Sequence, residues 1–476
     1  MYSSELSDPL ITSSGNSAVL PEASEVAPEP RPVHWTPLTR VGFRIAFLYF
    51  FCFLFLYGNG SLLALIPFVG NWITDKMSWP LNHLSEWAAV HVFHVTGVGA
   101  HFHPTGSGDT AVQWVQQLVF ICFAVVGGLV WTAISAARGN RRAEYSVLYA
   151  WLRFLLRLTT AFFMFLYGLS KLFPMQMAPI SIAVLNEPVG QMSPMTMLWS
   201  MLALHPVYEM ICGAAEVIGG ILLLFRRTAL AGALVSAFVM TNVLLYNIFF
   251  DVPVKLFAAN LLLALLFIVL PDVVPLYNFF WRHQPAAPVG VWIPPVKRRG
   301  FRIATRTVEI VYTVVFLVIG PAIMGYQWHR SQVEANKPTP LLGAWHLDAA
   351  HPASGAMITG EGLPATDFYV DSATRAFRRS TDLALWRTGL NIDGAAHTID
   401  IRPFPGEYVV YSWQMPDNDH LVLTSTPPKT DGKGKGAPSK TPFRPEVMTF
   451  TRTPIPSSYP LLTRGFHWIN EWGLER

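Results

Sequence analysis

The sequence has few cysteines and few charged residues, and both shortages argue against whole classes of protein. Its three cysteines, Cys52, Cys122 and Cys212, lie within apolar runs, and no two stand at Cys-x-x-Cys spacing. Neither a disulfide framework nor a thiol redox centre is therefore indicated. Charged residues make up only 13% of the 476 residues, and the net charge is +4. The basic residues stand at the ends of apolar runs instead of forming a stripe, so no nucleic-acid partner is indicated.

Apolar residues are abundant, at 52% of the chain, which is typical of a protein whose partner is the lipid bilayer. A helix needs about 20 apolar residues to cross a bilayer core. Seven stretches reach that length within a few residues: 44–68, 112–137, 148–170, 206–225, 228–250, 254–271 and 303–326. The sequence therefore predicts an α-helical membrane protein with about seven transmembrane helices.

Arginine and lysine residues predict how these spans are oriented. One set of connections carries most of the basic residues: Arg40, Arg44, Arg138, Arg141, Arg142, Arg226, Arg227, Arg282, Lys297, Arg298, Arg299 and Arg302. The opposite set carries only Lys76, Lys171 and Lys255. Because cytoplasmic connections are enriched in Lys and Arg, we expect a cytoplasmic N-terminus and an extracytoplasmic C-terminus, in a bacterial inner membrane or plasma membrane.

The same reasoning divides the chain into regions. Residues 1–39 are rich in Ser, Pro and Glu and lack a signal-peptide pattern, so a disordered cytoplasmic tail is predicted. The expected regions that follow are a two-span region 40–140 with an extracytoplasmic loop 70–111, a four-span core 148–272, a cytoplasmic linker 273–302, the seventh span 303–326 and a C-terminal domain 340–476.

The C-terminal domain has the pattern of an antiparallel β domain. From about residue 340 the chain consists of short β-type segments separated by turn residues: GAWHLD, LALWRTGLNID, HTIDIRPF, EYVVYSWQM, HLVLTST and VMTFTRT. We expect an extracytoplasmic small sandwich or barrel, with 429–441 as a mobile loop. The aromatic tail RGFHWINEW, residues 464–472, is expected to dock against the bundle or this domain, or to cover a pocket as a lid.

Polar side chains within the spans gather on the extracytoplasmic side. Such groups are costly in hydrocarbon unless they are paired or line a wet cavity. The residues concerned are Tyr167, Lys171, Glu209, Glu216, Asn242, Asn247, Asp251 and Lys255. One interpretation is a ligand pocket in the outer half of the bundle. The other is that the groups pair with one another and hold the helices together. No catalytic residue can be assigned, and whether the protein is an enzyme stays open.

The stretch HFHPTGSGDT, residues 101–110, supports two interpretations. With His91 and His94, its histidines have ligand types that suit Zn²⁺ or Cu²⁺, but no acidic ligand stands at metal spacing, and histidines are also common at membrane interfaces. We expect no metal. In GSGDT, Gly106 and Gly108 permit turns with positive φ, and Asp109 or Thr110 is placed to cap the second span. Asp109 is alternatively a lining residue of the pocket.

The segment 153–272 resembles the DoxX-like family of membrane proteins. The resemblance is carried by RFLLRLTTAFFMFLYGLSKLFPMQM, SPMTMLW, AAEVIGGILLLFRRTALAGALV and TNVLLYNIFFDVPVKLF, and GSGDT and RGFHWINEW are similar to the longer members. The family takes its name from similarity to the small membrane subunit of a thiosulfate:quinone oxidoreductase. The resemblance therefore implies a DoxX-like four-helix bundle and a quinone as the possible cofactor, with Tyr167, Lys171, Glu216 and Asp251 around its head group.

Two functions remain open at this stage. The first is a quinone-linked or redox-linked membrane component. The chain contains no flavin or nucleotide fingerprint and no cofactor motif, so electrons would have to arrive through a quinone or a partner subunit. The second is a non-enzymatic binding, assembly or transport protein of the cell envelope, whose β domain recognises an envelope ligand or a protein partner.

Overall fold

The computed structural model describes most of the chain. The described residues are 35–58, 61–65, 68–103, 106–139, 144–285, 299–352, 365–379, 385–402, 409–425 and 445–463. The expected tail up to residue 34, the loop 429–441 and the aromatic tail 464–472 lie outside them. Residues 271–285 belong to a separate compact unit and are described by themselves.

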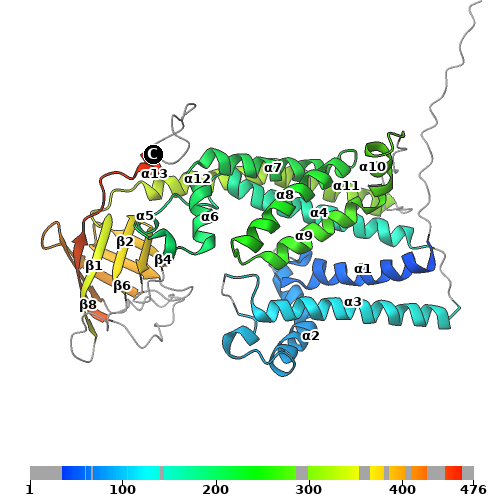
Figure 1. Ribbon diagram of the computed structural model, residues 1–476, viewed down its shortest axis with the longest axis horizontal. Coiled ribbons are helices and arrows are strands. Elements are labelled where there is room, and N and C mark those ends of the chain that lie inside the picture. The colour runs from blue at the N-terminus through cyan, green and yellow to red at the C-terminus, as the bar shows by residue number, and fades with distance from the viewer. Residues whose placement is uncertain are drawn as a thin grey trace, which may run out of the picture. The chain divides into compact units, whose positions relative to one another are not determined.

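The helical part consists of long helices joined by short helical connections (Figure 1). The long helices are α1 (Pro37–Leu56), α2 (Gly70–His91), α3 (Ala111–Ala137), α4 (Ser146–Leu172), α7 (Pro206–Leu224), α8 (Ala229–Phe249), α9 (Lys255–Val269), α11 (Arg299–Val314) and α12 (Gly320–Ala335). The shorter ones are α5 (Ile182–Leu185), α6 (Pro194–Ala203) and α13 (Pro460–Thr463). In the separate unit, α10 covers Val273–Phe280.

Seven helices among the described residues are long and apolar enough to cross a membrane: Pro37–Leu56, Ala111–Ala137, Ser146–Leu172, Pro206–Leu224, Ala229–Phe249, Lys255–Phe280 and Ile303–Ala335. The expectation of a helical membrane protein with a C-terminal β domain is confirmed at this level.

Three boundaries differ from those expected. The first span begins at Pro37 because Thr36 accepts a hydrogen bond from the Thr39 N–H and proline suits the first helical turn. The seventh span contains a π-helical stretch, Val315–Ile319, and continues as α12 to Ala335 instead of ending at residue 326. The sixth candidate span extends into the segment that was expected to be a linker.

Glycines allow the central helices to approach closely. Helix α7 packs against both α4 and α8, and α9 packs against α8 and α4. A Cβ atom built at Gly213 of α7 would lie 2.6 Å from the Gly168 carbonyl oxygen of α4. At Gly232 of α8, it would lie 2.5 Å from the Leu223 nitrogen. Small residues at such crossings are the usual means by which membrane helices gain van der Waals contact.

Hydrogen bonds between polar side chains join α1 to α3, to α9 and to Tyr145, the residue before α4. The guanidinium of Arg44 is buried and donates to the hydroxyls of Tyr145 and Thr132 at 2.7 Å each. Deeper in the bundle, Tyr49 donates to Asn260 at 2.5 Å and accepts from Gln117 at 2.6 Å. Asn260 donates to Gln117 at 3.2 Å. These three side chains satisfy one another and join α1, α3 and α9.

The β domain is a closed antiparallel barrel of eight strands in sequential order, in which the last strand pairs with the first (Figure 1). The strands are β1 (Gly343–Pro352), β2 (Asp367–Ser372), β3 (Arg375–Arg379), β4 (Leu385–Asp393), β5 (Thr398–Arg402), β6 (Val409–Gln414), β7 (His420–Ser425) and β8 (Pro445–Thr453). Six strands match the expected segments. The hairpin of β2 and β3 was missed because three of its residues are arginines, which disguise the alternation typical of strands.

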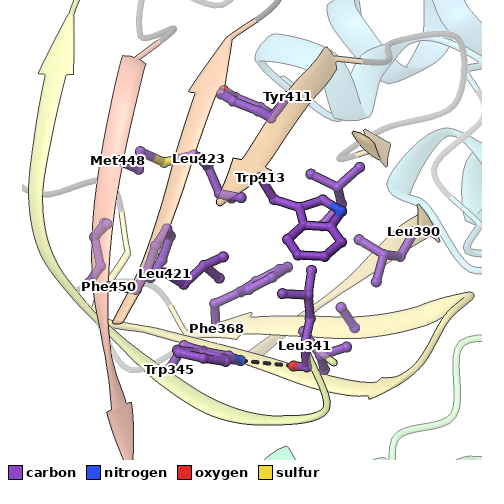
Figure 2. Close-up of a cluster of buried hydrophobic side chains, with 14 of the residues drawn as sticks. Leu341, Trp345, Phe368, Leu390, Tyr411, Trp413, Leu421, Leu423, Met448 and Phe450 are labelled. Atoms are coloured by element: carbon purple, nitrogen blue, oxygen red, sulfur yellow. Dashed lines mark hydrogen bonds between the residues drawn. The ribbon is translucent and has the colours of Figure 1, made fainter. Parts of the chain in front are cut away.

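The barrel is filled by large apolar side chains (Figure 2). Trp345, Trp413, Phe368 and Phe450 lie in its core, and the Trp345 indole N–H donates to the Leu341 carbonyl at 2.8 Å. Closure pairs every strand on both sides, which removes the exposed sheet edges that promote aggregation. The sequence left a small sandwich and a barrel as alternatives. The pairing of β8 with β1 shows that the domain is a barrel.

Candidate functional site

A cavity of about 290 Å³ lies beside the C-terminal end of α4, the N-terminal half of α7 and the C-terminal half of α8. Helix α6 and the segment after α4 complete its walls. Its polar lining comprises Lys171, Gln176, Tyr208, Glu209, Glu216, Asn242 and Asn247, and its apolar lining includes Leu198, Trp199, Ile211, Phe238 and Val243. The site is thus an apolar chamber with a small number of polar groups, which is the usual composition of small-molecule sites.

A buried ion pair stands on one wall of this cavity. The Nζ of Lys171 lies 2.6 Å from Oε1 of Glu216, and the side chains are 10% and 3% exposed. The pair forms because Gly213, one turn before Glu216, lets α7 approach α4 at Lys171. The second oxygen of Glu216 has no hydrogen-bond partner among the described residues. An acceptor therefore remains beside the cavity, where a ligand hydroxyl or a water molecule would satisfy it.

Glu209 occupies the same face of α7, two turns before Glu216. Its Oε1 accepts a hydrogen bond from the Met177 N–H at 3.0 Å, which ties the segment after α4 to the start of α7. Its Oε2, like that of Glu216, has no partner within the described part of the chain. Glu209 is nevertheless only 1% exposed. Two buried carboxylates thus each keep one unused oxygen at this cavity.

The cavity brings together five of the residues selected from the sequence: Lys171, Glu209, Glu216, Asn242 and Asn247. Asn247 is buried and its amide donates to the Val254 carbonyl at 3.4 Å, whereas Asn242 is exposed on α8. Their arrangement follows from the seven-residue spacing of the two glutamates and from the antiparallel run of α7 and α8.

Several lining residues were not selected from the sequence. Trp199 on α6 and the neighbouring pair Tyr208 and Cys212 on α7 contribute to the walls. The resemblance segment SPMTMLW contains Trp199, but an aromatic residue in an apolar run carries no sign that it faces a cavity. For Tyr208, only its position next to Glu209 in the sequence could have suggested that it lines the cavity.

Four of the selected residues do not line this cavity. Tyr167 contacts Phe163 and Phe257 within an aromatic cluster. Lys255 lies 2.7 Å from Asp251, whose side chain is 81% exposed. This pair stands at the turn into α9 because the left-handed backbone of Asp251 ends α8 there.

Asp109 is the fourth, and its role differs from both expectations. Its two carboxylate oxygens accept from the backbone N–H groups of Lys255 at 2.7 Å and Leu256 at 3.0 Å. It therefore caps α9 from a distant segment, where a negative charge is favoured by the helix dipole. At the start of α3, the expected cap is Thr110, whose N–H donates to the Gln113 side chain at 2.8 Å.

The glycines of GSGDT serve this contact in different ways. Gly106 has a φ of 79°, as expected, whereas Gly108 has no positive φ and instead donates its N–H to the Pro253 carbonyl at 2.8 Å. A Cβ atom at Gly108 would lie 3.4 Å from that oxygen. That distance is an ordinary van der Waals contact, so the loop is held to the turn between α8 and α9 by the Gly108 hydrogen bond and not by the lack of a side chain.

The segment after α4 links the cavity to the barrel. Beyond Met177, the Ile182 N–H donates to Oδ1 of Asp371 in β2 at 2.8 Å, and Arg375 donates to the Pro179 carbonyl at 3.1 Å. Burial raises the pKa of Asp371, although the Ile182 hydrogen bond and Arg375 partly oppose this. The same segment that borders the cavity is therefore held by the β domain.

Three of the four histidines His91, His94, His101 and His103 have local partners. His91 and His103 form hydrogen bonds with the carbonyls of Trp87 and His101, and His101 lies 3.7 Å from Glu86. Across the described ranges, no group of three His, Cys, Asp or Glu side chains is placed to hold a metal ion.

The fold and the cavity define a class of protein: a helical integral membrane protein with a mainly apolar cavity, a buried ion pair on its wall and an appended β barrel. Over 116 residues, 24% of its length, the chain is 30% identical to the uncharacterized protein YwoB of Bacillus subtilis (strain 168), and the match covers 73% of that protein. The chain therefore belongs to the same family as this Bacillus protein. No family model matches the chain, and no solved structure matches it significantly.

Proposed function

We propose that the protein binds the head group of a quinone in the cavity beside α4, α7 and α8, as a membrane-embedded component of a redox pathway. The observation that carries the proposal is the buried Lys171–Glu216 pair on the wall of an otherwise mainly apolar cavity. A pair that only held two helices together would be expected in a dry contact. Here both side chains border a space that can admit a ligand.

The chemistry of the lining suits a quinone. A quinone is a flat apolar ring with carbonyl oxygens at opposite ends, so it needs apolar walls and separate hydrogen-bond donors. Trp199 and Phe238 supply aromatic surface, while the ammonium of Lys171 and the amide of Asn242 are donors. The unused carboxylate oxygens of Glu209 and Glu216 are suited to accept from the hydroxyls of the reduced form.

The resemblance to DoxX-like proteins points to the same ligand class, and we extend the proposal to a DoxX-like bundle formed by α4, α7, α8 and α9. From the distribution of Arg and Lys we infer that the cavity lies in the extracytoplasmic half of an inner or plasma membrane. Electrons would come from a partner subunit, because no redox-cofactor motif is found in the sequence.

The test is quinone binding by the purified full-length chain. We expect mass spectrometry of the extracted protein to detect a co-purified quinone. A short-chain quinone analogue should bind in detergent, measured by quenching of tryptophan fluorescence. Glu216→Gln should weaken binding of the analogue at least tenfold, because it removes the charge that orients Lys171. Asp251→Asn makes the same chemical change outside the cavity and should leave the affinity unchanged.

Two outcomes would contradict the proposal. Equal affinity of the wild-type protein and Glu216→Gln would show that the analogue binds elsewhere. Recovery of a stable protein partner without any quinone would favour the alternative of an assembly or binding protein. That alternative has one structural argument in its support: Asp371 of the barrel binds Ile182, in the segment that follows the cavity-lining residue Met177.

A further inference from the structure

A second cavity, of about 580 Å³, lies at the other end of α7. Its walls come from the C-terminal end of α7, the turn into α8 and the C-terminal half of α11. Three arginines line it, Arg226, Arg227 and Arg306, against a single glutamate, Glu309. This cavity shares no lining residue with the proposed quinone site.

Glu309 is already fully engaged. Arg226 donates to both of its carboxylate oxygens, at 2.9 and 2.8 Å, and the buried Arg157 donates to Oε1 at 2.8 Å. One carboxylate therefore faces two guanidinium groups. This network holds α11 against α4 and α7, and it leaves an excess of positive charge at the cavity.

Arg227 and Arg306 increase that excess. Both are exposed, and within the described ranges neither has a carboxylate within 4.0 Å. Two guanidinium groups, Arg227 in the turn between α7 and α8 and Arg306 on α11, thus flank the same space without a carboxylate partner of their own among the described residues. Guanidinium groups are well suited to phosphate because they present several donors in a fixed plane.

The remaining wall is apolar. Phe225, Ile310 and Val314 line the cavity and are all exposed. A ligand that matches both walls has an anionic head and an apolar tail, which is the chemistry of a phospholipid. We propose that this cavity binds the phosphate of an anionic phospholipid, with Arg227 and Arg306 as its free charged ligands. Basic pockets between membrane helices are suited to such head groups.

The experiment measures lipid binding by the full-length chain in detergent micelles, by native mass spectrometry. Phosphatidylglycerol should bind at least tenfold more tightly than phosphatidylcholine. Arg227→Gln and Arg306→Gln should each weaken phosphatidylglycerol binding about fivefold, the usual effect of one basic residue near an anionic membrane. The double variant should lose about 25-fold, on the assumption that the two effects are independent.

Matched controls separate this proposal from simpler explanations. Arg330→Gln removes an exposed arginine of α12 that does not line the cavity and should leave binding unchanged. Unchanged thermal unfolding of the lipid-free variants will establish that they fold. Equal binding of both lipids, or wild-type affinity in the double variant, would overturn the proposal. If inorganic phosphate binds as tightly as phosphatidylglycerol, the cavity is a site for free phosphate, and the lipid assignment is wrong.

Discussion

The Lys171–Glu216 pair permits a quantitative test of how the bundle is held together. We expect Lys171→Met and Glu216→Gln each to lower the free energy of unfolding by about 3 kcal/mol, the lower end of the range for breaking a buried ion pair. The lower end is appropriate because both side chains border a cavity rather than a closed core. Each single variant leaves one polar group at the helix contact without its partner.

The double variant, Lys171→Met with Glu216→Gln, should lose less stability than the sum of the two single losses. With both charges removed, neither group is left uncompensated, so we expect it to lose less stability than either single variant. The assay is equilibrium unfolding in mixed micelles of increasing SDS content, followed by far-UV circular dichroism. Asp251→Asn breaks the exposed pair with Lys255 and serves as the control, with an expected change below about 0.5 kcal/mol.

Two results would refute the reasoning. One is a loss of unfolding free energy in the double variant equal to the sum of the two single losses. The other is single losses no larger than that of Asp251→Asn. Either result would mean that Lys171 and Glu216 do not interact across the contact of α4 and α7. The quinone-binding test remains separate, because it measures affinity in protein that is still folded.

Three further predictions concern other contacts. Asp109→Ala should destabilise the protein by about 1–2 kcal/mol in the same unfolding assay, since α9 loses the cap of its Leu256 N–H; an unchanged stability would contradict that role. Gly213→Val should separate α7 from Gly168 and abolish quinone binding, and retained binding would refute the close packing. Because burial raises the pKa of Asp371 above its ordinary value of 3.8, its contribution to stability is complete below 3.8 and is lost as the pH rises through the raised value. Asp371→Asn should remove this part of the pH dependence, and identical stability profiles of the two proteins would show that the carboxyl group does not titrate in this range.

The two parts of the fold differed in how far they could be predicted. The apolar runs are long enough that bilayer thickness alone determines which segments are candidate spans. Strand alternation similarly revealed six barrel strands. The β2–β3 hairpin was not predicted, because a half-buried strand is recognised by alternating apolar and polar residues. Consecutive arginines such as Arg378 and Arg379 in β3 interrupt that alternation. Closure of the barrel also depends on the register of β1 with β8, which no local pattern encodes.

The candidate site was partly predictable for a similar reason. The heptad spacing of Glu209 and Glu216 places both carboxylates on one face of α7, and the depth of Asn242 places it at a comparable level. Sequence could not specify that Lys171 pairs with Glu216, since this depends on which helices meet at Gly213.

By itself, the sequence determined the candidate spans, the position of the β domain and the helical face that carries the carboxylates, because each follows from local periodicity and the solvation of polar groups. Only the tertiary structure decided the partners. The clearest case is Asp109, which stands beside the start of α3 in the chain but caps α9. Its partners are 146 and 147 residues away, so the contact depends on the packing of the whole bundle rather than on any neighbouring residue.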